Sequence, residues 1–271
     1  MTDLTEERKS DQLRVYCISD LHLEFYDDYR TLYNRIKKFI PEADVLILAG
    51  DIGYPVKTHG KSRDHIGNYL GLLKRFRQKY DHVILVPGNH EYYCATGFDR
   101  NKVTTQLQQV CKEADVILLA NSTATIRGVK FYGTTLWSHA VPRIKDMMKD
   151  FDYVFPTVGQ YNNEHKTCAD WLTNAVKADI DDSTIRSQIV VTHHLPTTKL
   201  CIPQFKDHPC NSGFYSDVIE HIDTSKVKLW FAGHTHEFVS YIHSQTTIVV
   251  NPYGYPNEFR KTRVSSQIYI V

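Results

Sequence analysis

The sequence predicts an α/β chain with two β-sheets of different character. In the first half, short apolar runs rich in β-formers alternate with segments whose apolar residues recur at helical spacing. This order predicts a parallel sheet with crossover helices. In the last part of the chain, four apolar runs follow one another closely. The short links between the last three predict antiparallel pairing.

The first half is expected to contain four strands and three helices. The second strand is apolar through most of its length, as a strand covered on both faces should be. The expected strands are residues 13–18, 44–49, 83–86 and 116–119. The apolar faces of the expected helices lie within residues 29–40, 66–80 and 103–110.

The second half is expected to contain six strands and one helix. The strands are residues 130–133, 188–192, 227–232, 238–242, 247–250 and 267–271. The helix lies between the first two of these and includes residues 168–176. Residues 138–164 have weak periodicity and are expected to be a long surface excursion. No repeat or linker divides the chain, so we expect a single domain over residues 1–271, with 1–12 as a loose extension.

Composition excludes several functional classes. Lys and Arg total 32 and Asp and Glu total 31, so the chain lacks the basic excess of a protein that binds nucleic acid through phosphates. No apolar run approaches the ~20 residues of a membrane span, and the first residues lack the apolar segment of a signal peptide. The six cysteines form no CxxC pair. We therefore expect reduced thiols and a cytoplasmic protein that does not contact a membrane.

Polar clusters follow five of the expected strands. They are Asp20-Leu21-His22, Gly50-Asp51, Gly88-Asn89-His90, His193-His194 and Gly233-His234-Thr235-His236. Each cluster alone is readily explained by a turn or a helix cap. Five of them at strand ends, in the same sense, predict one site, because open α/β sheets bind ligands at the carboxyl ends of their strands.

The residue types in these clusters predict the chemistry. Carboxylate, amide and imidazole groups without thiolates suit Mn²⁺, Fe or Zn²⁺, and the residues do not choose among them. Seven candidate ligands exceed what one catalytic ion with an open position needs. They suit two divalent ions, which at ~3.5–4 Å separation can hold both the attacking and the leaving oxygen of an in-line displacement. A hydroxide between the ions would attack phosphorus.

In this order, the five motifs resemble those of the calcineurin-like metallophosphoesterase superfamily, in particular its small bacterial-type phosphoesterases. The resemblance implies a four-layer αββα sandwich of two packed mixed β-sheets flanked by helices. It implies that one metal ion is held by Asp20, His22, Asp51 and His236. It implies that the second ion shares Asp51 and is also held by Asn89, His193 and His234. His90 would be catalytic, either protonating the leaving oxygen or stabilising the phosphoryl oxygens.

The chain departs from the phosphoprotein phosphatases of this superfamily. Their second motif continues as Gly-Asp-x-Val-Asp-Arg-Gly, whereas this chain reads Gly50-Asp51-Ile52-Gly53-Tyr54-Pro55. Pro87 stands where their third motif has an arginine. Because paired arginines matter most for a dianionic monoester, we expect a small phosphodiester substrate. Phosphomonoesterase or protein phosphatase-like activity, and a non-catalytic scaffold of the same fold, are the alternatives. The sequence does not indicate the oligomeric state.

Several residues near the motifs have two interpretations. Glu91 either orients His90 or lies on the surface. His194 is expected to point away from the ion that His193 binds, with a substrate-facing role as the alternative. We expect Trp137 to belong to the core, while Tyr253 and Tyr255 fit the core and the substrate pocket equally. The loops of residues 138–214 are candidates for setting specificity.

Overall fold

Alternate side chains along the central strands enter different apolar layers, and this alternation organises the fold. The computed structural model describes residues 12–56, 64–93, 99–258 and 264–271. In strand β1 (Arg14–Ile18), Tyr16 packs with helices and Val15 packs with a second sheet. Strand β2 (Val45–Ala49) repeats the pattern with Leu46 and Ile47. All four side chains are fully buried, so this sheet is covered on both faces.

The first sheet has five strands in the order β11-β1-β2-β3-β4. The further strands are β3 (His82–Val86), β4 (Ile117–Leu118) and β11 (Tyr269–Ile270). β1 to β4 are parallel, as expected. β11 is antiparallel to β1, and Leu13 and Val271 exchange two backbone hydrogen bonds beside it. The expected pairing of β11 with the other late strands is therefore wrong.

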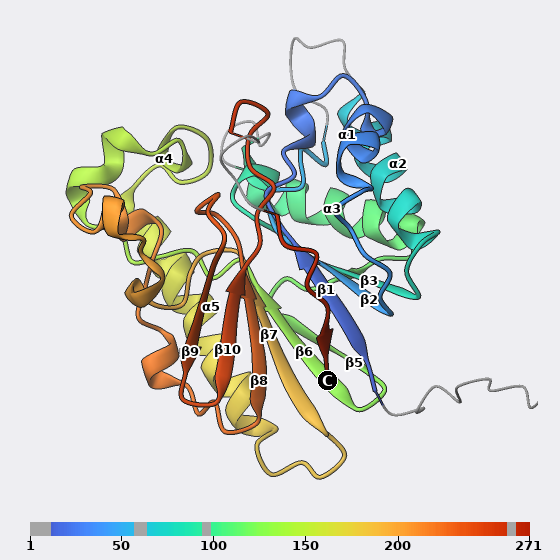
Figure 1. The fold of residues 1–271 in the computed structure, drawn as a ribbon. Coiled ribbons are helices and arrows are strands. Elements are labelled where there is room, and N and C mark those ends of the chain that lie inside the picture. Colours follow the sequence, from blue (N-terminus) through green and yellow to red (C-terminus); the bar gives the residue numbers. More distant parts are fainter. Residues whose placement is uncertain (1–11, 57–63, 94–98, 259–263) are drawn as a thin grey trace, which may run out of the picture.

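Three helices cover the outer face of the first sheet (Figure 1). They are α1 (Tyr29–Ile36), α2 (His65–Arg77) and α3 (Arg100–Ala114). Each begins after an aspartate whose side chain accepts a hydrogen bond from a backbone N–H of the first turn: Asp28, Asp64 and Asp99.

The second sheet has six strands in the order β5-β6-β7-β8-β10-β9. They are β5 (Ser122–Ile126), β6 (Val129–Thr134), β7 (Ser187–Thr192), β8 (Val227–Ala232), β9 (Val239–His243) and β10 (Thr246–Val250). β6, β7, β8 and β10 are parallel, and only the edge strands β5 and β9 run antiparallel to their neighbours. This sheet is therefore mixed, and the antiparallel expectation holds only for β9 and β10.

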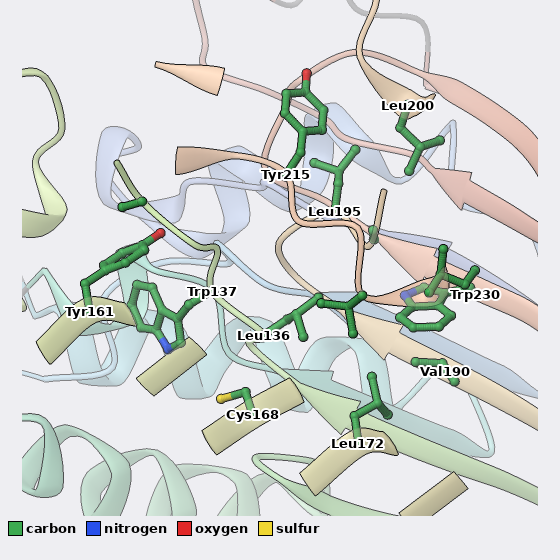
Figure 2. Packing of buried hydrophobic residues seen from close by; sticks show 14 of the residues in the cluster. Leu136, Trp137, Tyr161, Cys168, Leu172, Val190, Leu195, Leu200, Tyr215 and Trp230 are labelled. Atoms are coloured by element: carbon green, nitrogen blue, oxygen red, sulfur yellow. The ribbon is translucent and has the colours of Figure 1, made fainter. Parts of the chain in front are cut away.

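Helix α5 (Val158–Ala178) covers the outer face of the second sheet. Figure 2 shows Leu172 of α5 next to Val190 of β7, with Trp230 of β8 nearby, and Cys168 of α5 belongs to the same buried cluster. A separate buried layer lies between the two sheets and includes Phe131, on β6. The layers are thus helices, sheet, sheet and helix, which confirms the predicted αββα sandwich.

Residues 138–164 are not a surface excursion. They contain the 3₁₀ segment η4 (Pro142–Met147), the short helix α4 (Asp150–Tyr153) and the start of α5. Ile144, Phe151 and Phe155 from this stretch are buried in the core beside the second sheet. Helical periodicity did not reveal η4 and α4 because 3₁₀ turns and one-turn helices are too short to show a 3.6-residue repeat.

Short 3₁₀ turns make up much of the remaining structure. They are η1 (Leu23–Phe25), η2 (His90–Tyr92), η5 (Thr198–Leu200), η6 (Pro203–Phe205), η7 (Asn211–Gly213) and η8 (Ile219–His221). Within the described ranges, no helix combines the length and the apolar character that crossing a bilayer requires. The expected loose extension falls almost wholly outside the described residues, as does Cys94.

Candidate metal centre

The eight predicted site residues lie together at the carboxyl ends of strands from both sheets. The loops that follow β1, β2 and β3 meet the loops that follow β7 and β8 there. Backbone hydrogen bonds join the loops directly: Asp20 N–H donates to Gly50, His22 N–H donates to Asp51, and Gly233 N–H donates to His193. Motifs that lie up to 216 positions apart in the sequence, from Asp20 to His236, therefore form one cluster.

The backbone of this cluster is strained at the predicted ligands. Asp20, His22, Asp51, His234 and His236 have positive φ values between 48° and 73°. Non-glycine residues seldom adopt this conformation, which costs on the order of 1–3 kcal/mol where the surroundings enforce it. Five of the seven predicted ligands have this backbone conformation, so directing their side chains toward one point lowers the stability of the fold.

Two glycines in the motifs permit the close approach of the loops. Gly50 has a φ of 87°, and a Cβ atom there would overlap the ring of His193. A Cβ atom at Gly88 would overlap the carboxylate of Asp51. Glycine is required at both positions because a side chain would displace a predicted ligand.

Asp20, His22 and His236 form the first group that could hold a cation. The Nε2 atoms of His22 and His236 face each other at 3.0 Å, and His236 Nε2 lies 3.4 Å from Asp20 Oδ1. The Nδ1 atoms contact carboxylates, that of His22 at 3.0 Å from Glu24 and that of His236 at 2.7 Å from Glu258. When Nδ1 carries the proton, both Nε2 lone pairs converge on one point, as metal binding requires.

Asp51, His193 and His234 form the second group that could hold a cation. His193 Nε2 lies 3.4 Å from Asp51 Oδ1 and 3.0 Å from Asn89 Oδ1, while its Nδ1 is 2.9 Å from the carbonyl oxygen of Ala49. The Nε2 atom of His234 is buried and has no hydrogen-bond partner among the described residues. A buried imidazole nitrogen left without a partner beside a carboxylate fits a metal ligand.

Asp51 lies between the two groups. One of its carboxylate oxygens is 3.4 Å from His193 Nε2, and the other is 3.9 Å from His22 Nε2. Each oxygen therefore faces a different group. This arrangement fits a carboxylate shared by two ions.

His90 lies beside the two groups. Its Nδ1 is 2.9 Å from Glu24 Oε1, and its Nε2 is 3.3 Å from the hydroxyl of Tyr255 and 4.0 Å from Asp51 Oδ2. His90, His22 and Asp51 also form a group whose ligand atoms lie close enough together to hold a cation. His90 also lines the open cavity described below, where a substrate would lie, as does Tyr255.

The charges of the buried carboxylates dominate the electrostatics. Burial by itself lowers the pKa of His90 and His193, but the nearby carboxylates, with Asp51 foremost, together outweigh it and raise each pKa to about 9. Burial raises the pKa of Asp51, and the surrounding histidines reverse this and hold it well below its ordinary value. The centre is a negative cavity that attracts positive charge, whether protons or metal cations.

Three residues of the site were missed by the sequence analysis. Glu24 contacts the Nδ1 atoms of both His22 and His90, and Glu258 contacts that of His236. Tyr93 accepts a 2.8 Å hydrogen bond from the amide of Asn89. None of them belongs to a motif, although Glu24 and Tyr93 lie within four residues of one.

Glu91 fits neither of its two interpretations. It is fully buried and does not orient His90, whose Nδ1 contacts Glu24 instead. Its carboxylate accepts hydrogen bonds from four backbone N–H groups and one hydroxyl; the donors are Asp51, Ile52, Gly53, Gly88 and the hydroxyl of Tyr69. It therefore ties the second and third motifs together.

For the other residues that had two interpretations, burial and contacts decide between them. His194 is fully buried, stacks on His234 with ring centroids 4.2 Å apart and lies 3.3 Å from the carbonyl oxygen of Thr135, so it does not face the substrate. Trp137 is buried in the core, as expected. Tyr253 also belongs to the core, whereas Tyr255 lines the cavity at the metal centre.

The model of the calcineurin-like phosphoesterase family matches residues 13–238. This chain belongs to the calcineurin-like phosphoesterase family. The match spans all five motifs. Membership of this family indicates a metal-dependent phosphoesterase, which is a hydrolase. The two groups of Asp and His side chains that could hold cations agree with this.

Comparisons with individual proteins agree with this family. The chain is 29% identical to the uncharacterized protein L509 of Acanthamoeba polyphaga mimivirus, over 89% of this chain and 91% of that protein. The fold is similar to that of a phosphopantetheinyl hydrolase from Mycobacterium tuberculosis, with a TM-score of 0.68, 18% identity and coverage of 97% and 96% of the two chains. It is also similar to a dimetal phosphatase from Danio rerio, with a TM-score of 0.51, 12% identity and coverage of 88% and 86%. These two structures establish the calcineurin-like fold.

Proposed function

We propose that this member of the calcineurin-like phosphoesterase family is a dinuclear enzyme that hydrolyses a small phosphodiester. The observation that carries the proposal is that Asp51 lies between two groups that could hold cations, with one carboxylate oxygen 3.4 Å from His193 Nε2 and the other 3.9 Å from His22 Nε2. Asp20, His22 and His236 would hold one ion with Asp51, and Asn89, His193 and His234 would hold the other. When bound, two such ions supply positive charge for the phosphoryl oxygens and lower the pKa of water to near neutrality.

In this proposal, His90 acts on the leaving oxygen. Glu24 fixes the ring through Nδ1, which leaves Nε2 directed toward the cavity and 3.3 Å from the hydroxyl of Tyr255. The raised pKa of about 9 favours the protonated ring, which can donate a proton to the departing alkoxide. Bound cations would lower this pKa and bring it nearer to neutral pH, where a general acid is most effective.

The charges around the cavity favour a diester over a monoester. Among the described residues that line it, the only ammonium or guanidinium group is that of Lys149, which pairs with Asp152 at 3.0 Å. The carboxylates of Asp150 and Glu258 line the same cavity. A dianionic phosphate would find no arginine pair there. A singly charged diester is therefore the better match.

The test compares bis(p-nitrophenyl) phosphate with p-nitrophenyl phosphate in the presence of Mn²⁺. We expect a higher kcat/KM for the diester and a loss of at least about 100-fold in Asp51→Asn, which removes the shared carboxylate. A preference for the monoester would contradict the proposed substrate class but would still support a phosphoesterase. An inactive protein whose melting temperature does not change with Mn²⁺ or with a chelator would instead support the scaffold alternative.

A further inference from the structure

We infer that the substrate carries a planar aromatic group, held by an apolar wall that lies beside the metal centre. This inference rests on the proposed function, because it concerns the organic part of the same phosphoester. A cavity of about 620 Å³ opens over the predicted ligands Asp51, Asn89, His234 and His236. Its volume is in the range typical of small-molecule sites.

Most of the large apolar side chains that are exposed among the described residues line this cavity. In the part of the chain that the structure describes, six large apolar side chains are exposed, and four of them line this cavity. The four are Phe25, Met147, Tyr153 and Phe205, with exposed fractions of 53%, 50%, 44% and 40%. We call these four residues the apolar wall. Exposed apolar side chains concentrated beside a polar centre indicate a surface that a ligand covers.

The apolar wall is continuous with the metal centre on two sides. On one side, the ring of Phe25 lies 5.3 Å from that of Tyr255, which is 4.3 Å from the ring of His22. On the other side, the ring of Tyr153 lies 5.4 Å from that of Tyr93, which is 4.3 Å from the ring of His90. A group attached to a phosphate at the centre would therefore reach the apolar wall directly.

The composition of the apolar wall favours an aromatic group. Three of its four members are aromatic, and the fourth offers the polarisable sulfur of Met147, which also binds ring edges well. Met147 and Phe205 come from η4 and η6, within residues 138–214, whose loops the sequence analysis named as candidates for setting specificity. An additional phosphate would be poorly accommodated, because the carboxylates of Asp150 and Glu258 line the cavity and Lys149 already pairs with Asp152.

The experiment varies only the organic group of the substrate. Three p-nitrophenyl phosphodiesters, whose second ester group is methyl, phenyl or 2-naphthyl, are compared with the Mn²⁺-loaded full chain. We expect kcat/KM to rise about tenfold or more from methyl to naphthyl, because stacking and burial of the rings stabilise the complex. The double variant Met147→Ala/Phe205→Ala should reduce this ratio to near one. The matched control is Ile242→Ala, an exposed apolar residue outside the cavity, which should leave the ratio unchanged.

A parallel binding measurement separates this inference from the proposed function. Calorimetry with 2-naphthyl methylphosphonate and methyl methylphosphonate reports affinity without turnover. If no diester is hydrolysed but the naphthyl compound binds about tenfold more tightly, and the double variant loses that difference, the apolar wall still binds the aromatic group of a ligand, whereas the proposed hydrolysis fails. Equal rates and equal affinities across each series would overturn the inference. So would a naphthyl preference that persists in the double variant.

Discussion

The hydroxyl of Tyr93 donates a 2.9 Å hydrogen bond to Oδ2 of Asp150 and accepts one of 2.8 Å from Nδ2 of Asn89. Because the amide nitrogen of Asn89 is engaged in this way, its oxygen is turned toward His193 Nε2, at 3.0 Å. Burial raises the pKa of Asp150 to about 6, and its carboxylate accepts the hydrogen bond of the phenol, whose own pKa burial raises well above its ordinary value. A residue of α4 thus fixes the orientation of a predicted metal ligand.

Replacing Tyr93 with Phe should loosen this amide and lower both Mn²⁺ affinity and kcat/KM by about tenfold, as is typical when a group that orients a ligand is removed. Calorimetric Mn²⁺ titration and turnover of bis(p-nitrophenyl) phosphate measure the two effects. Tyr33→Phe, on the outer helix α1, is the control. Unchanged metal affinity in Tyr93→Phe would mean that Asn89 does not depend on the phenol for its orientation.

Glu24→Gln should weaken metal binding and slow turnover, each by about 10- to 100-fold. One carboxylate oxygen, Oε1, serves the Nδ1 atoms of both His22 and His90, at 3.0 and 2.9 Å. Burial raises the pKa of Glu24, but the charges of these histidines prevail and lower it to about 2. The amide keeps one acceptor but loses the negative charge. The same two measurements apply, with the exposed Glu113→Gln as the control. Normal values for Glu24→Gln would contradict a positioning role.

Glu91→Gln should destabilise the fold by about 2–4 kcal/mol. The carboxylate accepts from four backbone N–H groups, and the amide NH₂ of glutamine would place donors against donors. Urea unfolding monitored by tryptophan fluorescence measures the change in free energy. Glu113→Gln should stay within about 0.5 kcal/mol of the wild type, as surface substitutions usually do. Wild-type stability for Glu91→Gln would show that these bonds are dispensable.

Asp44→Asn should cost about 1 kcal/mol at pH 7 and less in acid. Burial raises the pKa of Asp44, but hydrogen bonds from Arg14 outweigh it, so the pKa lies below its ordinary value of 3.8. A carboxyl group with a lowered folded-state pKa stabilises the fold above the unfolded pKa and loses this contribution as pH falls through the folded value.

Urea midpoints measured from pH 7 to 3.5 test this dependence. The difference between the wild type and Asp44→Asn should be constant down to about pH 5 and shrink below about pH 4. Asp152→Asn, in an exposed ion pair, should stay within about 0.5 kcal/mol of the wild type at pH 7. A difference that grows in acid would contradict the assigned sign.

The apolar runs of the sequence predicted the buried strands and the outer helices, because these elements have regular periodicity. Strand β5 was missed, since Ser122–Ile126 lies at a sheet edge and is mostly polar or small. β11 was assigned to the wrong sheet because proximity in sequence favours β10, whereas its partner β1 lies at the other end of the chain. Local patterns cannot reveal such a pairing.

The five motifs predicted the cluster of donors because their chemistry recurs at strand ends. Glu24, Glu258 and Tyr93 escaped notice, since a residue that only orients a ligand needs no fixed spacing from it. The apolar wall also escaped notice, because a Phe or Met in an irregular loop has the same composition as a core residue. Whether such a side chain is buried or exposed depends on the tertiary structure alone.

The pairing of β11 with β1 also affects how the chain folds during synthesis. The edge of β1 can be covered by its native partner only after residues 269 and 270 have left the ribosome, because Arg14 pairs with Ile270. His236, which faces His22 and Asp20, also emerges 214 residues after His22. The nascent chain therefore exposes a strand edge and an incomplete set of donors until residue 270 has emerged, and such transiently exposed edges promote misfolding and capture by chaperones.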